Sequence, residues 1–182
     1  MEIAMKLKTI IPITLLIVIL CLGTLSSAAE FASKTIDVGI VVGNIDKAVK
    51  FYSEALGMKE VPGFEVPAGF AGDAGLTDGK PLVVRVMVLG DGPGATKLKL
   101  MQISGTSSRP GSNKFIHSQL GFSYLTIGIM DTNSAVARLE KAGVKPLAKS
   151  PIALPPPLPQ NIFVTLIRDP DGNLIELVGP KK

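Results

Sequence analysis

The sequence predicts an α+β fold made of two βαβββ modules. Three observations indicate it. The stretch IDVGIVVGNIDKAVKFYSEALG (36–57) and the stretch SYLTIGIMDTNSAVARLEKAG (123–143) each read as an alternating strand, a capping residue and a helix. A glycine follows each helix, as expected where a helix ends. Each copy is then followed by three further apolar segments of strand length. The chain is therefore an internal duplication of one supersecondary unit.

The N-terminus carries a targeting signal rather than part of the fold. Lys6 and Lys8 precede the apolar run 10–22, and small residues follow it. This order is typical of a secretory signal peptide, which we assign to residues 1–29. The run is shorter than the roughly 20 residues of a membrane span, although an uncleaved anchor stays open. We expect export to the periplasm or the cell exterior, with membrane contact only through an uncleaved N-terminal segment.

Composition after residue 29 excludes several kinds of chemistry. The only cysteine, Cys21, lies in the predicted signal, so disulfides, thiolate nucleophiles and zinc–cysteine sites are excluded. Residues 30–182 carry 17 basic and 14 acidic side chains, a net charge of +3 with His117 neutral. These charges are scattered and do not alternate with aromatic residues, so we expect no nucleic-acid partner. His117 lies between the modules, where a lone histidine is usually solvated.

The first module begins with a strand at 36–42. Asn44 is placed to cap the helix, which repeats apolar residues at i, i+3, i+4 and i+7 from Ile45 and ends before Gly57. The three strands expected after this helix are 58–66, 81–89 and 96–103. The glycine-rich stretch 64–80 is predicted to be extended and exposed.

The second module begins with a strand at 123–129. Asp131 or Thr132 caps its helix, which ends before Gly143. The three strands expected after it are 145–154, 162–167 and 174–178, with a proline-rich loop at 151–159. Between the last two strands, the DPDG sequence at 169–172 has the residues of a type I turn.

Side-chain alternation divides each strand into an apolar face and a mixed face. In the last strand, Glu176 shares a face with Leu174 and Val178, whereas Ile175 and Leu177 lie on the other. We predict that the apolar faces pack against the helices and that the mixed faces line one surface. The polar residues expected on this surface, as lining or ligand-binding groups, are Asp37, Arg85, Lys99, Tyr124, Thr165 and Glu176.

Two of these stretches, VGIVVGNIDKAVKFYSEALG and DPDGNLIEL, resemble the vicinal oxygen chelate superfamily. It includes glyoxalase I, bleomycin-resistance proteins and extradiol dioxygenases. The likeness covers residues 34–180, with modules at 34–105 and 120–180. It implies an open eight-stranded cup with the helices packed outside. In catalytic members, four inward side chains on the first and last strand of each module bind a divalent metal.

The equivalent positions here are Asp37, Lys99, Tyr124 and Glu176, where the family usually has His, Glu or Gln, His and Glu. Only Glu176 is a family-type ligand. Lysine ligates a metal only when deprotonated, and zinc and iron sites of this kind require more histidines than the one in this chain. We expect no cofactor. A weak Mg²⁺ or Ca²⁺ site on Asp37 and Glu176 is left open.

These positions suggest that Lys99 substitutes for the metal ion. Its ammonium is expected to pair with Asp37 and Glu176, and Arg85 would bring the cluster close to neutrality. Two other readings stay open, in which Glu176 forms a simple structural ion pair and Arg85 recognises an anionic ligand.

Two functions follow from the sequence. The first is a metal-free cup that binds a small molecule. The alternative is a divalent-metal-dependent glyoxalase-, dioxygenase- or isomerase-like enzyme with altered ligands; if the protein is an enzyme, a glyoxalase-like lyase or a dioxygenase is expected. The sequence identifies neither ligand nor reaction, and family precedent leaves a homodimer open.

Overall fold

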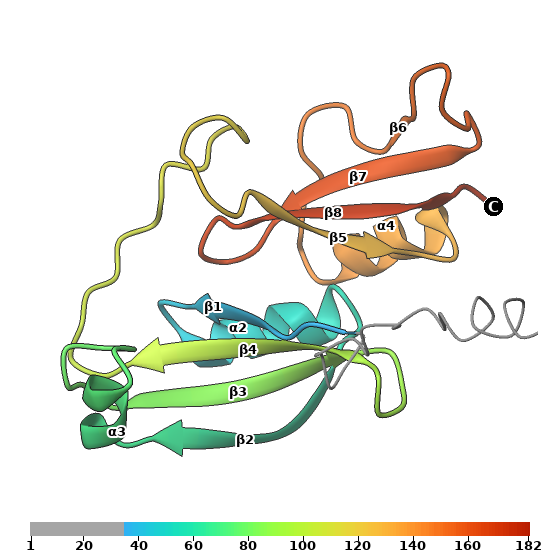
Figure 1. Ribbon diagram of the computed structural model, residues 1–182. Helices are drawn as coiled ribbons and strands as arrows, with labels where there is room; N and C mark the ends of the chain where they lie inside the picture. The colour runs from blue at the N-terminus through green and yellow to red at the C-terminus, as the bar shows by residue number, and fades with distance from the viewer. Residues whose placement is uncertain (1–34) are drawn as a thin grey trace, which may run out of the picture. The chain divides into compact units, whose positions relative to one another are not determined.

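The computed structural model describes residues 35–182, so the predicted signal peptide at 1–29 lies outside the described residues. The described chain contains two four-stranded sheets, each with a ten-residue helix (Figure 1). Both sheets are open, which confirms the α+β class and the duplicated βαβββ pattern. Across residues 35–182, every helix is too short or too polar to span a bilayer.

The first module forms a sheet of strand order β1-β4-β3-β2. β1 runs parallel to β4, and the other neighbours are antiparallel. Its elements are β1 (Val38–Val41), α2 (Ile45–Glu54), β2 (Lys59–Val66), α3 (Ala68–Asp73), β3 (Leu82–Leu89) and β4 (Thr96–Ile103).

The second module repeats this topology with strand order β5-β8-β7-β6. β5 is parallel to β8, as β1 is to β4. Its elements are β5 (Tyr124–Gly128), α4 (Thr132–Lys141), β6 (Ile152–Ala153), β7 (Ile162–Arg168) and β8 (Leu174–Pro180).

Local side-chain chemistry determines where the two main helices begin and end. The Asn44 side chain accepts a hydrogen bond from the backbone of Lys47, and the Asp131 carboxylate accepts from the two backbone N–H groups at the start of α4. Asp131 is therefore the N-cap of α4, rather than Thr132. Gly57 and Gly143 have φ values of +74° and +71°, the left-handed conformation that glycine adopts most readily after a helix.

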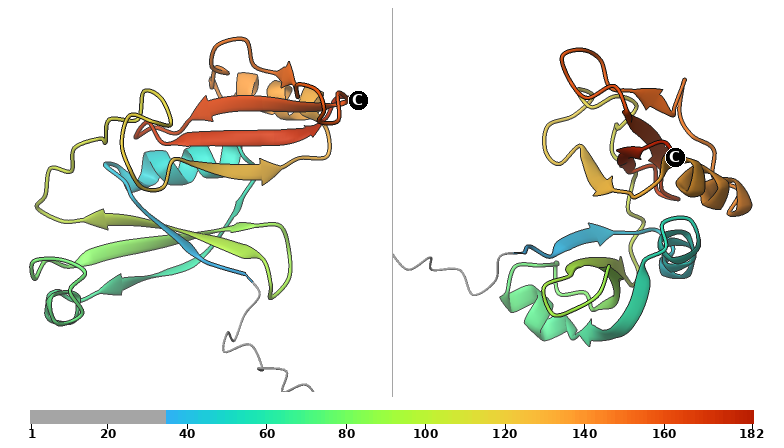
Figure 2. Two further views of the ribbon diagram at one scale, coloured as in Figure 1. Left: turned by 45° about the horizontal axis from the view of Figure 1, so that its top comes forward. Right: turned by 90° about the vertical axis from the view of Figure 1, so that its right-hand side faces the viewer.

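One hydrophobic core joins the helices to both sheets. Figure 2 shows α2 and α4 on the same side of the sheets, and Arg138 Nε of α4 donates to the carbonyl of Ala55, the residue that ends α2, at 2.9 Å. The largest fully buried apolar residues of this core are Tyr52, Met87, Leu100, Leu139, Ile167, Ile175 and Leu177. We call the face of each sheet that packs on this core the helix face, and the opposite face the open face.

A buried polar contact links the modules. Tyr52 of α2 donates its hydroxyl proton to Asp169 Oδ2 at 2.9 Å, and Asp169 is 5% exposed. The same carboxylate accepts from the backbone N–H groups of Asp171 and Asn173 and from the Asn173 amide. The N–H of Gly172 bonds to the carbonyl of Asp169 at 3.0 Å, which closes the predicted turn. Burial, followed by the charge of Asp169, raises the pKa of Tyr52.

Two segments differ from the sequence prediction. The stretch 145–154 contains only the two-residue strand β6, since prolines at positions 146 and 151 remove backbone donors from it. The stretch 64–80 is not extended throughout, because it contains the helix α3. Ala71 of α3 is fully buried in a second apolar cluster with Val66, Leu82, Val84 and Val86. Its glycines give α3 poor intrinsic propensity, so this packing has to stabilise it.

Candidate functional site

Burial identifies the open face of the first sheet. Val38 and Ile40 of β1 pack on the core cluster, so Gly39 and Val41 point to the opposite side. In β4, Leu98 and Leu100 are buried in the same core, so Lys99 lies on the open face between them. Lys99 therefore lies on the face that side-chain alternation predicted for it.

Lys99 forms an ion pair on this face. Its Nζ lies 2.9 Å from Oδ2 of Asp37, the residue just before β1. The two side chains are 36% and 38% exposed, so solvent reduces the strength of the contact. Gly39 lies opposite Lys99 in the parallel ladder. A Cβ at Gly39 would lie 2.9 Å from the terminal methyl of Met101, so a larger residue would displace that side chain.

Glu176 lies on the open face of the second sheet. Its neighbours Ile175 and Leu177 are fully buried on the helix face, which confirms the predicted alternation in β8. Thr126 lies opposite Glu176 in the parallel β5–β8 ladder, and its hydroxyl donates to Glu176 Oε1 at 2.9 Å. Within residues 35–182, Glu176 forms no ion pair, and the ion-pair partner of Lys99 is Asp37.

Tyr124 lies two residues before Thr126 in β5 and shares its face. Its side chain is 49% exposed. A half-exposed ring on the same face as the Glu176 carboxylate offers a bound molecule both an apolar and a polar surface.

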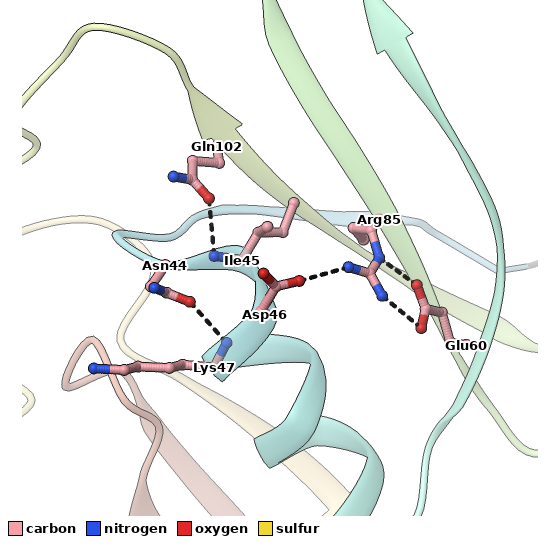
Figure 3. Close-up of polar contacts among 7 residues, drawn as sticks. All are labelled: Asn44, Ile45, Asp46, Lys47, Glu60, Arg85 and Gln102. Carbon is pink, nitrogen blue, oxygen red and sulfur yellow. Dashed lines mark hydrogen bonds and ion pairs between the residues drawn. The ribbon is translucent and has the colours of Figure 1, made fainter.

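Arg85 lies on the helix face, so its predicted position among the residues of the open face is wrong (Figure 3). It pairs in the β3–β4 ladder with Leu100, which is fully buried on the helix face, and paired residues share a face. Arg85 Nη1 lies 2.9 Å from Asp46 Oδ1 at the start of α2, and Nη2 lies 2.8 Å from Glu60 Oε2 of β2. Hydrogen bonding to Arg85 lowers the pKa of Glu60.

Thr165 also lies on the helix face, contrary to its predicted position. It pairs with Leu177 in the β7–β8 ladder and is fully buried. Its hydroxyl has no hydrogen-bond partner among the described residues. Thr165 is therefore a core residue, and the predicted cluster of two positive and two negative groups is reduced to Lys99 with Asp37, and Glu176 with Thr126.

Thr126 is the residue that sequence reasoning left out of the site. Alternation within β5 places Thr126 on the same face as Tyr124, and this was the sequence signal that could have identified it. The structure adds that Thr126 pairs with Glu176 in the β5–β8 ladder. His117, in contrast, is an exposed linker residue whose ring stacks on Phe115 with centroids 5.6 Å apart.

The residues present do not fit the metal site that the fold family implies. Asp37 is held by the Lys99 ammonium, and a cation bound at Asp37 would lie beside that positive charge. Tyr124 is a poor ligand while its phenol keeps its proton. No group of three or more His, Cys, Asp or Glu side chains suited to a metal occurs within residues 35–182.

Comparison with known proteins supports the same fold. The family model of the Glyoxalase/Bleomycin resistance protein/Dioxygenase superfamily matches residues 36–177. A glyoxalase family protein from Bacillus cereus is similar with a TM-score of 0.67 and 22% identity, over 85% of this chain and 99% of that one. Glyoxalase I from Zea mays gives a TM-score of 0.56 and 17% identity, over 80% of this chain and 44% of that one.

An integron cassette protein from Vibrio cholerae has a TM-score of 0.51 and 24% identity, covering 82% of this chain and 96% of that one. At these identities, the structural neighbours establish the fold alone. No curated protein matches the chain at a significant level. Because the family model covers most of its length, the chain belongs to the Glyoxalase/Bleomycin resistance protein/Dioxygenase superfamily.

Proposed function

We propose that this protein is an exported binding protein that holds a small molecule on the open faces of its two sheets without a metal ion. The observation that carries the proposal is the 2.9 Å contact between Lys99 Nζ and Asp37 Oδ2. The resemblance to the superfamily implies that these two residues stand where its catalytic members place metal ligands. The Lys99 ammonium neutralises the Asp37 carboxylate, which a metal ion at this position would need as a ligand.

The remaining groups suit a small ligand with a polar end and an apolar body. Glu176 and Thr126 present a carboxylate and a hydroxyl side by side, and the Tyr124 ring adds half-exposed aromatic surface on the same face. Sites for small molecules combine a few placed polar groups with apolar and aromatic surface in this way. Export rests on the N-terminal pattern around Lys6 and Lys8, and N-terminal sequencing of protein secreted by the cell tests it.

The binding proposal is tested by amide NMR spectra of the full chain titrated separately with phenol, benzamide and indole. We expect at least one probe to shift the amide resonances of Thr126 and Glu176. The substitution Tyr124→Ser should weaken the binding of that probe. Leu158→Ser is the matched control, since Leu158 is 50% exposed in the proline-rich loop. Shifts confined to other surfaces, or equal weakening by the two variants, would contradict the proposal.

The alternative function is a divalent-metal-dependent glyoxalase-, dioxygenase- or isomerase-like enzyme in which Glu176 and Asp37 serve as ligands. One observation favours it: Glu176 keeps the family-type carboxylate on the open face, bonded to a neutral hydroxyl rather than to a cation. Metal retention distinguishes this alternative from the binding protein, because the alternative requires a stoichiometric ion.

A further inference from the structure

A groove on the helix side of the molecule collects positive charge over an apolar floor. Two hollows of about 250 and 530 Å³ adjoin there, since Glu54 and Ala142 line both. Lys47 and Lys50 of α2 border one hollow, and Arg138 and Lys141 of α4 border the other. We call these four cations with Glu54 and Ala142 the basic groove.

The floor of the basic groove is apolar. Phe51 of α2 and Ala55, which follows this helix, are buried in the core cluster, and the same hollow is lined by Val144 and by Pro170 of the turn between β7 and β8. The elements that form the groove are also linked to one another. Arg138 Nε donates to the Ala55 carbonyl, and Tyr52 bonds to Asp169 next to Pro170. The groove is therefore a built feature of the packed core.

The charges of the groove are not neutralised internally. Four cations face one carboxylate, and none of these five side chains forms an ion pair within residues 35–182. Residues 35–182 carry 16 basic and 13 acidic side chains, a net charge of +3. The groove alone has a net charge of +3, so the rest of this part of the chain is balanced. Its positive charge is concentrated here.

We propose that the basic groove binds an organic anion with an apolar body, such as a carboxylate, sulfonate or phosphate attached to a ring or short alkyl chain. The apolar part would lie against Phe51, Val144 and Pro170, and the anionic part would contact Lys47 and Lys50. This site is separate from the open faces, because α2 and α4 cover the opposite side of the sheets. The hollow with the apolar floor measures about 250 Å³, which suits a small organic anion, and the adjoining hollow of about 530 Å³ lies in the range of roughly 300–1,000 Å³ typical of drug-sized ligands.

The test uses two fluorescent probes that share one body. 1-Anilinonaphthalene-8-sulfonate carries the anionic group, and N-phenyl-1-naphthylamine lacks it. Both are titrated into the full chain. We expect the double variant Lys47→Gln/Lys50→Gln to bind the sulfonate about fivefold or more weakly, since exposed ion contacts contribute modestly each. Its binding of the neutral probe should not change.

Three further variants test whether the effect is specific to the groove. Lys97→Gln/Lys149→Gln removes the same charge from exposed positions outside the groove and should bind the sulfonate as the wild type does. Glu54→Gln removes the only carboxylate of the groove and should tighten sulfonate binding about twofold or more, which general destabilisation would not do. Equal losses in the two lysine pairs, or weaker binding in Glu54→Gln, would overturn the proposal. Loss of the sulfonate site in Phe122→Ser would also overturn it, since Phe122 belongs to an exposed apolar linker.

Discussion

Removing the hydroxyl of Tyr52 should weaken the contact between the two modules. Tyr52→Phe deletes the hydrogen bond to Asp169 Oδ2 and leaves the ring packed in the core. A hydrogen bond to a charged group contributes about 1.5–3 kcal/mol to stability. Asp169 keeps three other donors, from Asp171 and Asn173, so we expect a loss of about 2 kcal/mol. In a domain of this size, that loss lowers Tm by about 4–8 °C.

The assay is equilibrium urea unfolding of the full chain followed by circular dichroism. Tyr124→Phe is the matched control, because it removes a hydroxyl from a half-exposed tyrosine with no hydrogen bond to a described residue. Tyr52→Phe should unfold at clearly lower urea, while Tyr124→Phe should match the wild type. If the two variants unfold at the same urea concentration, the Tyr52–Asp169 contact does not stabilise the module interface.

The pH dependence of the same contact provides a second readout. The folded state holds the pKa of Tyr52 above its ordinary value of 10.0, through burial and then the charge of Asp169. The unfolded chain ionises this phenol at its ordinary value, so the contribution is full below about pH 10 and falls as pH rises further. The stability contributed by Tyr52 then decreases by up to about 1.4 kcal/mol for each pH unit. Tyr52→Phe should lack this alkaline loss, and Tyr124→Phe should retain it.

Three further predictions concern single side chains. The Ser134 hydroxyl, followed by the backbone N–H of Lys182, lowers the pKa of Asp131 from 3.8 to about 2, so stability from Asp131 is present above pH 4 and is lost as pH falls toward 2. Asp131→Asn should flatten the acid side of the stability–pH curve, and an unchanged curve would contradict this. Gly63→Ala would place a Cβ 2.1 Å from the Val84 carbonyl oxygen, so we expect a loss of about 3 kcal/mol or more in urea unfolding; a neutral result would refute the close approach. Thr165→Val removes a buried hydroxyl without a partner among the described residues and should stabilise the fold by about 1 kcal/mol, whereas a clear loss would show that the hydroxyl is bonded.

The sequence predicted the faces of Lys99 and Glu176 because each is flanked by leucine or isoleucine on both sides. In β4 and β8 the two apolar neighbours are buried, so a single charged residue between them has to point to the other face. This alternation of apolar and charged residues is local, so a short segment of the strand is enough to predict which face the charged side chain occupies. The DPDG turn and the two helix caps were also predictable, because the residues that determine each of them lie within about four positions of one another.

Arg85 and Thr165 could not be placed in this way. The predicted strands 81–89 and 162–167 are apolar on both faces, so the one polar residue within each, Arg85 or Thr165, appeared to mark the open face. The ladder partners Leu100 and Leu177 determine the face instead, and these lie on other strands. Pairing register is a nonlocal property that alternation within one strand does not contain.

The helix α3 was missed for a related reason. Four glycines at positions 69, 72, 75 and 79 are typical of a flexible loop, and they predict no helix. Packing of Ala71 against the valines of the first sheet stabilises this short helix, and it covers part of the open face. An extended insertion would have left this part of the open face exposed, whereas α3 and the second apolar cluster cover it.

We propose that Lys99 occupies the place of a metal ion, and a measurement of metal retention distinguishes this arrangement from a metal site. The full chain is offered Ni²⁺, Zn²⁺, Fe²⁺, Mn²⁺ and Mg²⁺ separately, desalted and analysed by plasma mass spectrometry. We expect every metal to be retained far below one equivalent. Retention near one equivalent of any of them, abolished by Glu176→Ala but not by Glu140→Ala, would contradict the claim and favour the metal-dependent enzyme.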